Sequence, residues 1–221
     1  MCPCFFLDLM IIFMELIFVT NNPGKLKEIR SLLGDNFQLK SLKDIGFEGE
    51  IPETKPTLEG NASAKAFYIY DRFLVDCFAD DTGLEVEVLN NQPGVFSARF
   101  AEMDRPVRYT GKKELTEANI EKLLKLMDGK KSRKARFRTV ISLVLGGKEL
   151  LFEGIVRGKI TSEKRGEGGF GYDPVFIAEG HSKTFAQMSL EEKNRISHRA
   201  IAFRKLVSYL EGSRDIIDGN F

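Results

Sequence analysis

The sequence has no tryptophan, two histidines and only three cysteines in 221 residues. Three cysteines, two of them at positions 2 and 4, do not make a disulfide framework and leave no second pair for a four-ligand zinc site. We therefore expect a reducing, cytoplasmic environment. An excess of either charge is missing too, because 33 Lys+Arg are set against 32 Asp+Glu. A net charge of +1 removes the simplest argument for a nucleic-acid-binding protein, which needs a strong basic excess.

A long hydrophobic segment is also missing. Residues 1–13 are mostly apolar, but they have no basic start, they carry Asp8 in their middle and they are too short to span a bilayer. We expect neither a secretory signal nor a membrane partner. We expect residues 1–13 to be an N-terminal extension outside the fold, 14–212 to be a single domain and 213–221 to be a C-terminal tail.

The charges that are present are segregated along the chain. Residues 1–107 hold 10 basic and 17 acidic side chains, whereas residues 108–138 hold 11 and 4. An acidic part can hold a cation and a basic stretch can hold an anion. The 108–138 segment also keeps open the alternative of a nucleic-acid-binding protein.

The spacing of apolar residues predicts alternating strands and helices. We expect helices at about 25–33, 58–73 and 114–127, and a last helix that begins at Ser189 with a capping box to Glu192. We expect strands at 16–20, 74–79 and 84–89, and a hairpin of 135–145 with 149–157. Strands that alternate with helices early and pair as hairpins later predict an α/β fold with a mixed sheet.

A polar turn links the first strand to the first helix: Thr20, Asn21, Asn22, Pro23, Gly24 and Lys25. Backbone N–H groups at a helix start favour an anion, and Lys25 adds a positive charge. The turn is not a Walker A loop, because Val19 and Leu26 replace its glycine and its hydroxyl residue. The alternative is a structural turn with Lys25 in solvent.

Two adjacent carboxylates, Asp80 and Asp81, stand before Thr82 and Gly83, where we expect a buried strand to end. Like charges raise each other's pKa, so this arrangement calls for a cation, and hard oxygen ligands suit Mg²⁺ bound together with phosphate. Glu53 is a weaker third carboxylate. The alternative is a solvated acidic turn.

Two further segments carry candidate binding residues. A glycine-rich loop presents Phe170, Gly171, Tyr172 and Asp173 ahead of a strand-like run, which excludes a dinucleotide fingerprint because that motif must open a helix. Its aromatic rings can stack on a base or belong to the core. Lys193, His198 and Arg199 lie in the last helix, where helical spacing alone spreads them around the axis.

Taken in order, these segments resemble the inosine triphosphate pyrophosphatase family from about Leu16 to Leu210. The resemblance rests on TNNPGK at 20–25, ET followed by TLEGNASAKA within 53–66, ADDTGLEVEVLNNQPGVFSARFA at 79–101, GFGYDPVF at 169–176 and KNRISHRA at 193–200. It implies an elongated two-lobed fold around a mixed sheet, with an active-site cleft between the lobes, as a homodimer. It also implies Mg²⁺-assisted hydrolysis of ITP, dITP and XTP to the monophosphate and diphosphate.

The resemblance assigns roles residue by residue. Asp81 would be catalytic and would bind Mg²⁺ with Asp80 and Glu53, and the sequence leaves open whether Asp81 is a general base or a metal ligand. Substrate would contact Thr20, Asn21, Asn22, Pro23, Gly24, Lys25, Lys65, Thr82, Phe170, Gly171, Tyr172, Asp173, Lys193, His198 and Arg199.

Two positions depart from the family pattern. Lys55 replaces a glycine and Gly60 replaces a glutamate, so a carboxylate close to the supposed metal site is missing. A related pyrophosphatase with a different base choice is a further alternative.

Overall fold

The structure is a computed structural model that describes residues 14–33, 37–103 and 109–217. The expected N-terminal extension, residues 1–13, lies outside the described residues. None of the described helices is long and apolar enough to cross a membrane.

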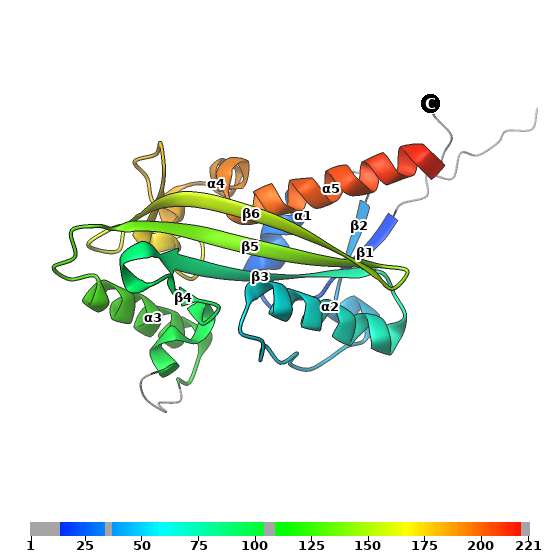
Figure 1. Ribbon diagram of the computed structural model, residues 1–221, viewed down its shortest axis with the longest axis horizontal. Helices are drawn as coiled ribbons and strands as arrows, with labels where there is room; N and C mark the ends of the chain where they lie inside the picture. The colour runs from blue at the N-terminus through cyan, green and yellow to red at the C-terminus, as the bar shows by residue number, and fades with distance from the viewer. Residues whose placement is uncertain (1–13, 34–36, 104–108, 218–221) are drawn as a thin grey trace, which may run out of the picture.

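A mixed sheet forms the centre of the molecule, as the sequence predicted (Figure 1). Its strand order is β2 (Phe37–Ser41), β1 (Met14–Phe18), β3 (Cys77–Val86), β5 (Lys134–Leu145), β6 (Lys148–Ile160) and β7 (Phe176–Ala178). The short β4 (Gln92–Gly94) pairs with β3 outside this order. β1 is parallel to both of its neighbours, and the pairs from β3 to β7 are antiparallel.

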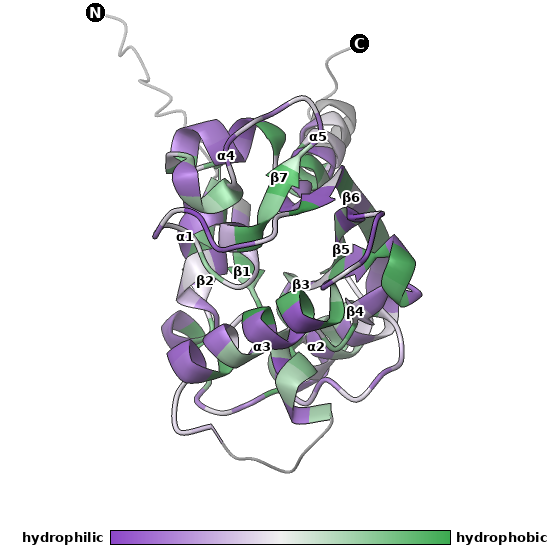
Figure 2. Cartoon of the chain, turned by 90° about the vertical axis from the view of Figure 1, so that its left-hand side faces the viewer, coloured by the Kyte–Doolittle hydropathy of each residue, from purple (hydrophilic) through white to green (hydrophobic). Residues whose placement is uncertain are grey.

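Helices cover both faces of the sheet. α2 (Leu58–Phe73) packs Ala66 and Ile69 on one face, and α5 (His198–Ile217) packs Phe203 and Leu206 on the other. Figure 1 shows α2 and α5 on opposite sides of the long β5–β6 hairpin. Seen from the end of the sheet, α1 (Pro23–Arg30) and α4 (Leu190–Ile196) lie on one side of β3, and α3 (Lys112–Leu126) lies on the other (Figure 2).

The segment around Asp80 and Asp81 differs from the expectation of two strands joined by a turn. β3 runs without interruption from Cys77 to Val86, because β5 pairs with it residue by residue along its whole length. Successive side chains of a strand point to opposite faces. The two carboxylates therefore leave the sheet in opposite directions, in the middle of a strand.

The last helix also differs from the expectation, because it is broken. The capping box of Ser189 and Glu192 is confirmed. Ser197 then takes an extended conformation (φ −69°, ψ 150°), which ends α4 and lets α5 begin at His198. The break turns the residues after Ser197 away from the positions that one continuous helix would give them.

Candidate active site

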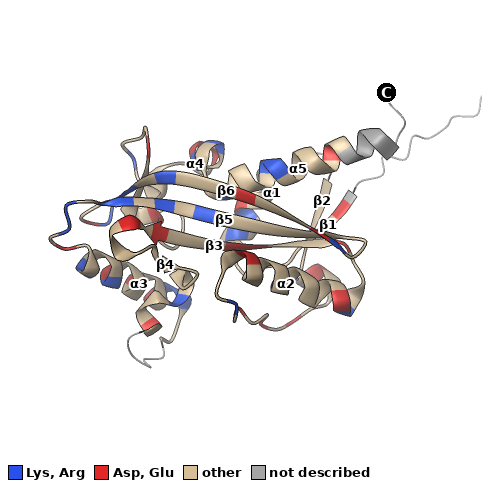
Figure 3. Cartoon of the chain, viewed as in Figure 1, with Lys and Arg blue, Asp and Glu red and all other residues tan. Residues whose placement is uncertain are grey.

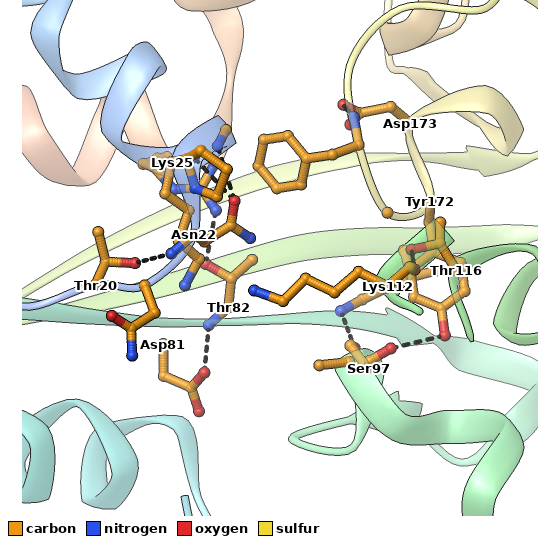
Figure 4. A pocket seen from close by; sticks show the side chains of 18 of the residues that line it. Thr20, Asn22, Lys25, Asp81, Thr82, Ser97, Lys112, Thr116, Tyr172 and Asp173 are labelled. Atoms are coloured by element: carbon orange, nitrogen blue, oxygen red, sulfur yellow. Dashed lines mark hydrogen bonds between the residues drawn. The ribbon is translucent and has the colours of Figure 1, made fainter. Parts of the chain in front are cut away.

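A pocket of about 670 Å³ lies where the β1–α1 turn, β3, α3, the loop before β7 and the α4–α5 junction meet (Figure 4). It brings together nearly all of the residues that the sequence singled out. The lining includes Thr20, Asn21, Asn22, Pro23, Gly24, Lys25, Glu53, Lys65, Asp81, Thr82, Phe170, Gly171, Tyr172, Asp173, Lys193, His198 and Arg199. Asp80 is not part of the lining.

The turn before α1 satisfies much of its own hydrogen bonding. Asn22 caps the helix, and its Oδ1 accepts hydrogen bonds from the N–H groups of Gly24 (2.9 Å) and Lys25 (3.3 Å). The N–H of Asn22 donates to Oγ1 of Thr20 at 3.2 Å. These amides, which we expected to face an anion, are held within the turn, because two polar side chains lie close enough to accept from them.

Asp80 is the counter-ion of two cations. Its carboxylate is 2.8 Å from Nζ of Lys25 and 3.2 Å from Nε of Arg199. Burial alone would raise the pKa of Asp80, but Lys25 and Arg199 outweigh it and hold that pKa well below its usual range. Lys25 is therefore fixed on a buried carboxylate rather than extended into solvent.

Asp81 faces the pocket from the other side of β3. Its Oδ2 accepts a hydrogen bond from Nδ2 of Asn61 at 3.0 Å, and Nζ of Lys65 lies 3.8 Å from its Oδ1. Burial raises the pKa of Asp81 by more than Lys65 and Lys25 lower it. A carboxylate with a raised pKa is a stronger base than an ordinary aspartate.

Lys65 lies between two carboxylates that face the pocket. Its ammonium group donates to Glu53 and, at 2.7 Å, to the carbonyl oxygen of Asp80. The three expected metal ligands are not gathered, because Asp80 leaves β3 on the opposite face. Among the described residues no group of three or more His, Cys, Asp and Glu side chains could hold a metal ion. Glu53 and Asp81 remain as the pair on the pocket side.

The two departures from the family pattern are neighbours in space. A Cβ added at Gly60 would lie 2.9 Å from Cβ of Lys55 and 3.1 Å from Oγ1 of Thr57. The space that a side chain at position 60 would need is therefore filled by Lys55. The larger residue at position 55 therefore goes together with the smaller residue at position 60.

The glycine-rich loop forms the other end of the pocket. The N–H of Phe170 donates to Asp173 at 2.8 Å, and the Phe170 ring lies 4.8 Å from Nζ of Lys193. Gly24 lets the ring approach the β1–α1 turn, because a Cβ at that position would lie 2.7 Å from the Phe170 ring and would make it shift. The hydroxyl of Tyr172 donates to the carbonyl oxygen of Ser97 at 3.1 Å. Phe170 is therefore a half-buried platform that lines the pocket, and Tyr172 anchors the loop.

Sequence reasoning missed Glu28, which joins the two ends of the pocket. Its buried carboxylate lies 2.7 Å from Nζ of Lys193 and also pairs with Arg199. Lys193 in turn lies 2.5 Å from Asp173. The one signal in the sequence was its spacing, since a residue three positions after Lys25 lies on the same side of a helix. Asn61, which holds Asp81, was missed as well.

His198 lines the pocket as a neutral base. Its ring stacks on Phe137 with centroids 4.5 Å apart and planes at 12°. Burial lowers the pKa of His198 well below its usual value, and Arg199 and Lys193 lower it further. Its Nδ1 is buried and has no hydrogen-bond partner among the described residues. The break at Ser197 brings His198 and Arg199 to the same pocket as Lys193, which periodicity had not predicted.

The sequence and the fold identify the family. A model of the Ham1 family matches residues 16–209, and the chain belongs to that family. The chain is 50% identical over 198 residues to a dITP/XTP pyrophosphatase of Flavobacterium psychrophilum, covering 90% of this chain and all of the relative. It is 50% identical over 197 residues to a protein of the same name from Porphyromonas gingivalis, covering 89% and 97%.

Solved structures agree on the fold. The Ham1 protein of Staphylococcus aureus matches with a TM-score of 0.77 and 37% identity, over 90% of this chain and 99% of that one. The nucleoside-triphosphatase / dITP/XTP pyrophosphatase of Mycobacterium abscessus matches with a TM-score of 0.68 and 36% identity, over 87% and 98%. The expected mixed α/β fold is confirmed.

Proposed function

We propose that this chain hydrolyses the non-standard purine nucleoside triphosphates dITP, XTP and ITP to the monophosphate and diphosphate. One observation carries the proposal: a single pocket has lysines and a basic carboxylate at one end and an aromatic platform beside a neutral imidazole at the other. The first end suits a phosphate chain and the second suits a flat base. The family and its curated relatives make the chain a nucleoside-triphosphate pyrophosphohydrolase.

At the phosphate end, hydrolysis needs a positioned water, neutralised charge and a diphosphate that is held as it leaves. Asp81 is the residue that would position and activate the water, because its pKa is raised and Asn61 and Lys65 fix its orientation. It would take a proton from water as the oxygen attacks the α-phosphate. Lys25 and Lys65, with the hydroxyl of Thr20, would hold the phosphate oxygens.

The donor set on the pocket side fits Mg²⁺. This ion binds through one or two carboxylates together with phosphate oxygens, and Glu53 and Asp81 are two carboxylates that face the pocket. Glu53 would hold the ion together with the phosphate oxygens, which leaves Asp81 to act as the base. When bound, the ion neutralises phosphate charge and polarises the bond that breaks. Lys65 contacts both carboxylates, and so keeps them together before substrate arrives.

At the base end, selectivity would come from buried polar atoms that only the correct base satisfies. Nδ1 of His198 is buried without a partner among the described residues, and Phe170 offers a face on which a purine can stack. A base that leaves a buried polar atom unpaired is rejected strongly. Arg199 and Lys193, which also line the pocket, would add donors for the 6-oxo group.

The nucleic-acid-binding alternative has less support. Arg133 donates to the carbonyl oxygen of Ile160 at 2.6 Å, and Arg136 lies 2.5 Å from Glu85. Arg138 pairs with Glu59 and with Glu153. Lys and Arg do gather at this end of β5 and β6 (Figure 3), but three of the arginines have partners within the fold.

The test is diphosphate release from dITP, XTP, dGTP, dATP and dUTP with Mg²⁺. Wild type should cut dITP and XTP far faster than dGTP, and Asp81→Asn should lose this activity. Asp71→Asn, at an exposed position of α2, is the matched control and should behave as wild type. Equal rates for dITP and dGTP would contradict the base choice, and an active Asp81→Asn variant would contradict the role of Asp81.

A further inference from the structure

One face of α3 forms a wall of the pocket. Lys112, Leu115, Thr116 and Asn119 line it, and their spacing places them on one side of a helix. Asn119 fixes this wall, because its Oδ1 accepts from the N–H of Ala101 at 2.7 Å and its Nδ2 donates to the carbonyl oxygen of Ala98 at 3.1 Å. α3 is therefore fixed at Asn119 against the 97–103 segment.

Lys112 is the charged group on that wall. Figure 4 shows its side chain reaching from α3 into the pocket toward Thr82. Within the part of the chain that the structure describes, no carboxylate or carbonyl oxygen pairs with its ammonium group. It lies on the opposite side of the pocket from the β1–α1 turn.

The other cations that line the pocket already have carboxylate partners. Lys25 pairs with Asp80, Lys65 with Glu53, Lys193 with Asp173 and Glu28, and Arg199 with Glu28 and Asp80. Together with Asp81, these acids outnumber the four cations by one. The paired groups alone thus leave the pocket slightly negative. A polyanionic substrate needs positive charge beyond these pairs.

We propose that Lys112 is a substrate-binding residue that contacts the phosphate chain from the α3 side; this assignment rests on the proposed function. Lys112 supplies a positive charge that no carboxylate of the described residues compensates, unlike the charges of the other four cations. Its direction, toward Thr82 beside Asp81, places it with the phosphate end of the pocket rather than with Asp173 and the base end. A phosphate contact strengthens the binding of every triphosphate equally, whereas a base contact changes the choice among them.

The matched pair of variants is Lys112→Met and Lys113→Met. Lys113 is the next residue, is also exposed and does not line the pocket. We expect Lys112→Met to lower kcat/KM about tenfold, mainly through KM, as for the loss of one charge-assisted hydrogen bond. The factor should be the same for dITP, XTP and dGTP. Lys112→Arg should retain most of the activity, and Lys113→Met should match wild type.

A second readout needs no turnover. Binding of inorganic tripolyphosphate to the full chain, measured by calorimetry, should weaken by a similar factor in Lys112→Met and not in Lys113→Met. If wild type is active but Lys112→Met and Lys113→Met have the same kcat/KM and the same tripolyphosphate affinity, the assignment of Lys112 is overturned and the proposed function is not. A loss that differs among the three nucleotides would overturn the phosphate contact. A wild type inactive on every triphosphate would overturn the proposed function and this assignment with it.

Discussion

Replacing Glu28 with glutamine removes one buried negative charge and changes little else in shape. Glu28 is 3% exposed and pairs with both Lys193 and Arg199. Each cation keeps one other carboxylate, since Lys193 contacts Asp173 and Arg199 contacts Asp80. Breaking a buried ion pair costs about 3–5 kcal/mol when the remaining charge has no partner. Because both cations stay partly compensated, we expect the lower end, about 3 kcal/mol.

The expected result is a large fall in thermal stability. In a chain of this size, 1 kcal/mol shifts Tm by about 2–4 °C, so Glu28→Gln should unfold about 6–12 °C below wild type. The control is Glu153→Gln, because Glu153 also shares an arginine, Arg138, that keeps a second carboxylate. Glu153 is 43% exposed, so its loss should cost less than about 1 kcal/mol.

The measurement is Tm at pH 7 by circular dichroism, in low salt and in 0.5 M salt. Salt should reduce the small effect of Glu153→Gln and leave that of Glu28→Gln unchanged, because buried pairs are screened much less than exposed ones. Glu28→Gln should also lower the ratio of kcat/KM for dITP to kcat/KM for dGTP, since Glu28 orients Lys193 and Arg199. A Tm loss no larger than that of the control would refute the buried ion-pair reasoning.

Two further predictions concern the phosphate end and the base platform. Asn61→Ala removes a hydrogen bond that lowers the pKa of Asp81, so the pKa should rise further and the acid limb of the pH profile of kcat/KM should move to higher pH. A limb that stays in place or moves to lower pH would contradict the role of Asp81 as base. Gly24→Ala places a methyl group 2.7 Å from the Phe170 ring, and overpacking of this kind costs about 1–3 kcal/mol. Because the ring must shift to relieve the contact, kcat/KM for dITP should fall about 5- to 150-fold. Gly212→Ala, where a Cβ meets no atom within 4 Å, should leave kcat/KM unchanged.

The sequence was sufficient for the elements whose patterns are local. Helix 58–73 was predicted to the residue, because its apolar spacing is regular. The hairpin of 135–145 with 149–157 was predicted to within three residues, since β6 continues to Ile160. The capping box at Ser189 is likewise a short-range signal. The family motifs, taken in order along the chain, also predicted which residues line the pocket. The residue spacing within each motif did not predict that these residues lie close together.

The middle of β3 could not be predicted from local pattern. Polar residues and a glycine inside an apolar run are typical of a turn, and Asp80–Gly83 has that composition. The segment stays extended because β5 pairs with it and because each carboxylate meets a remote partner: Lys25 and Arg199 for Asp80, Asn61 for Asp81. Such partners lie 20 to 119 residues away, and no local pattern reports them.

The break at Ser197 was missed for the opposite reason: here the local pattern is regular, but the structure is not. The apolar positions on either side of it fit one continuous helical period, so the sequence predicts one helix. A single extended residue costs one turn of helix hydrogen bonding and rotates every later side chain about the axis. That rotation is what brings His198 and Arg199 beside Lys193 in the pocket.

The cations of the pocket and their acids form one row of alternating charge: Lys25, Asp80, Arg199, Glu28, Lys193 and Asp173. Buried ion pairs add little net stability, because desolvation offsets their attraction, so stability alone does not account for five such pairs in contact. The row does keep three cations charged and in place beside the pocket. Burial already lowers the pKa of Lys25, with Lys65 and Arg199 adding to the shift, and Asp80 opposes that loss of charge. Because Asp80 and Glu28 each hold two cations, a change at either one disturbs the phosphate end and the base end together.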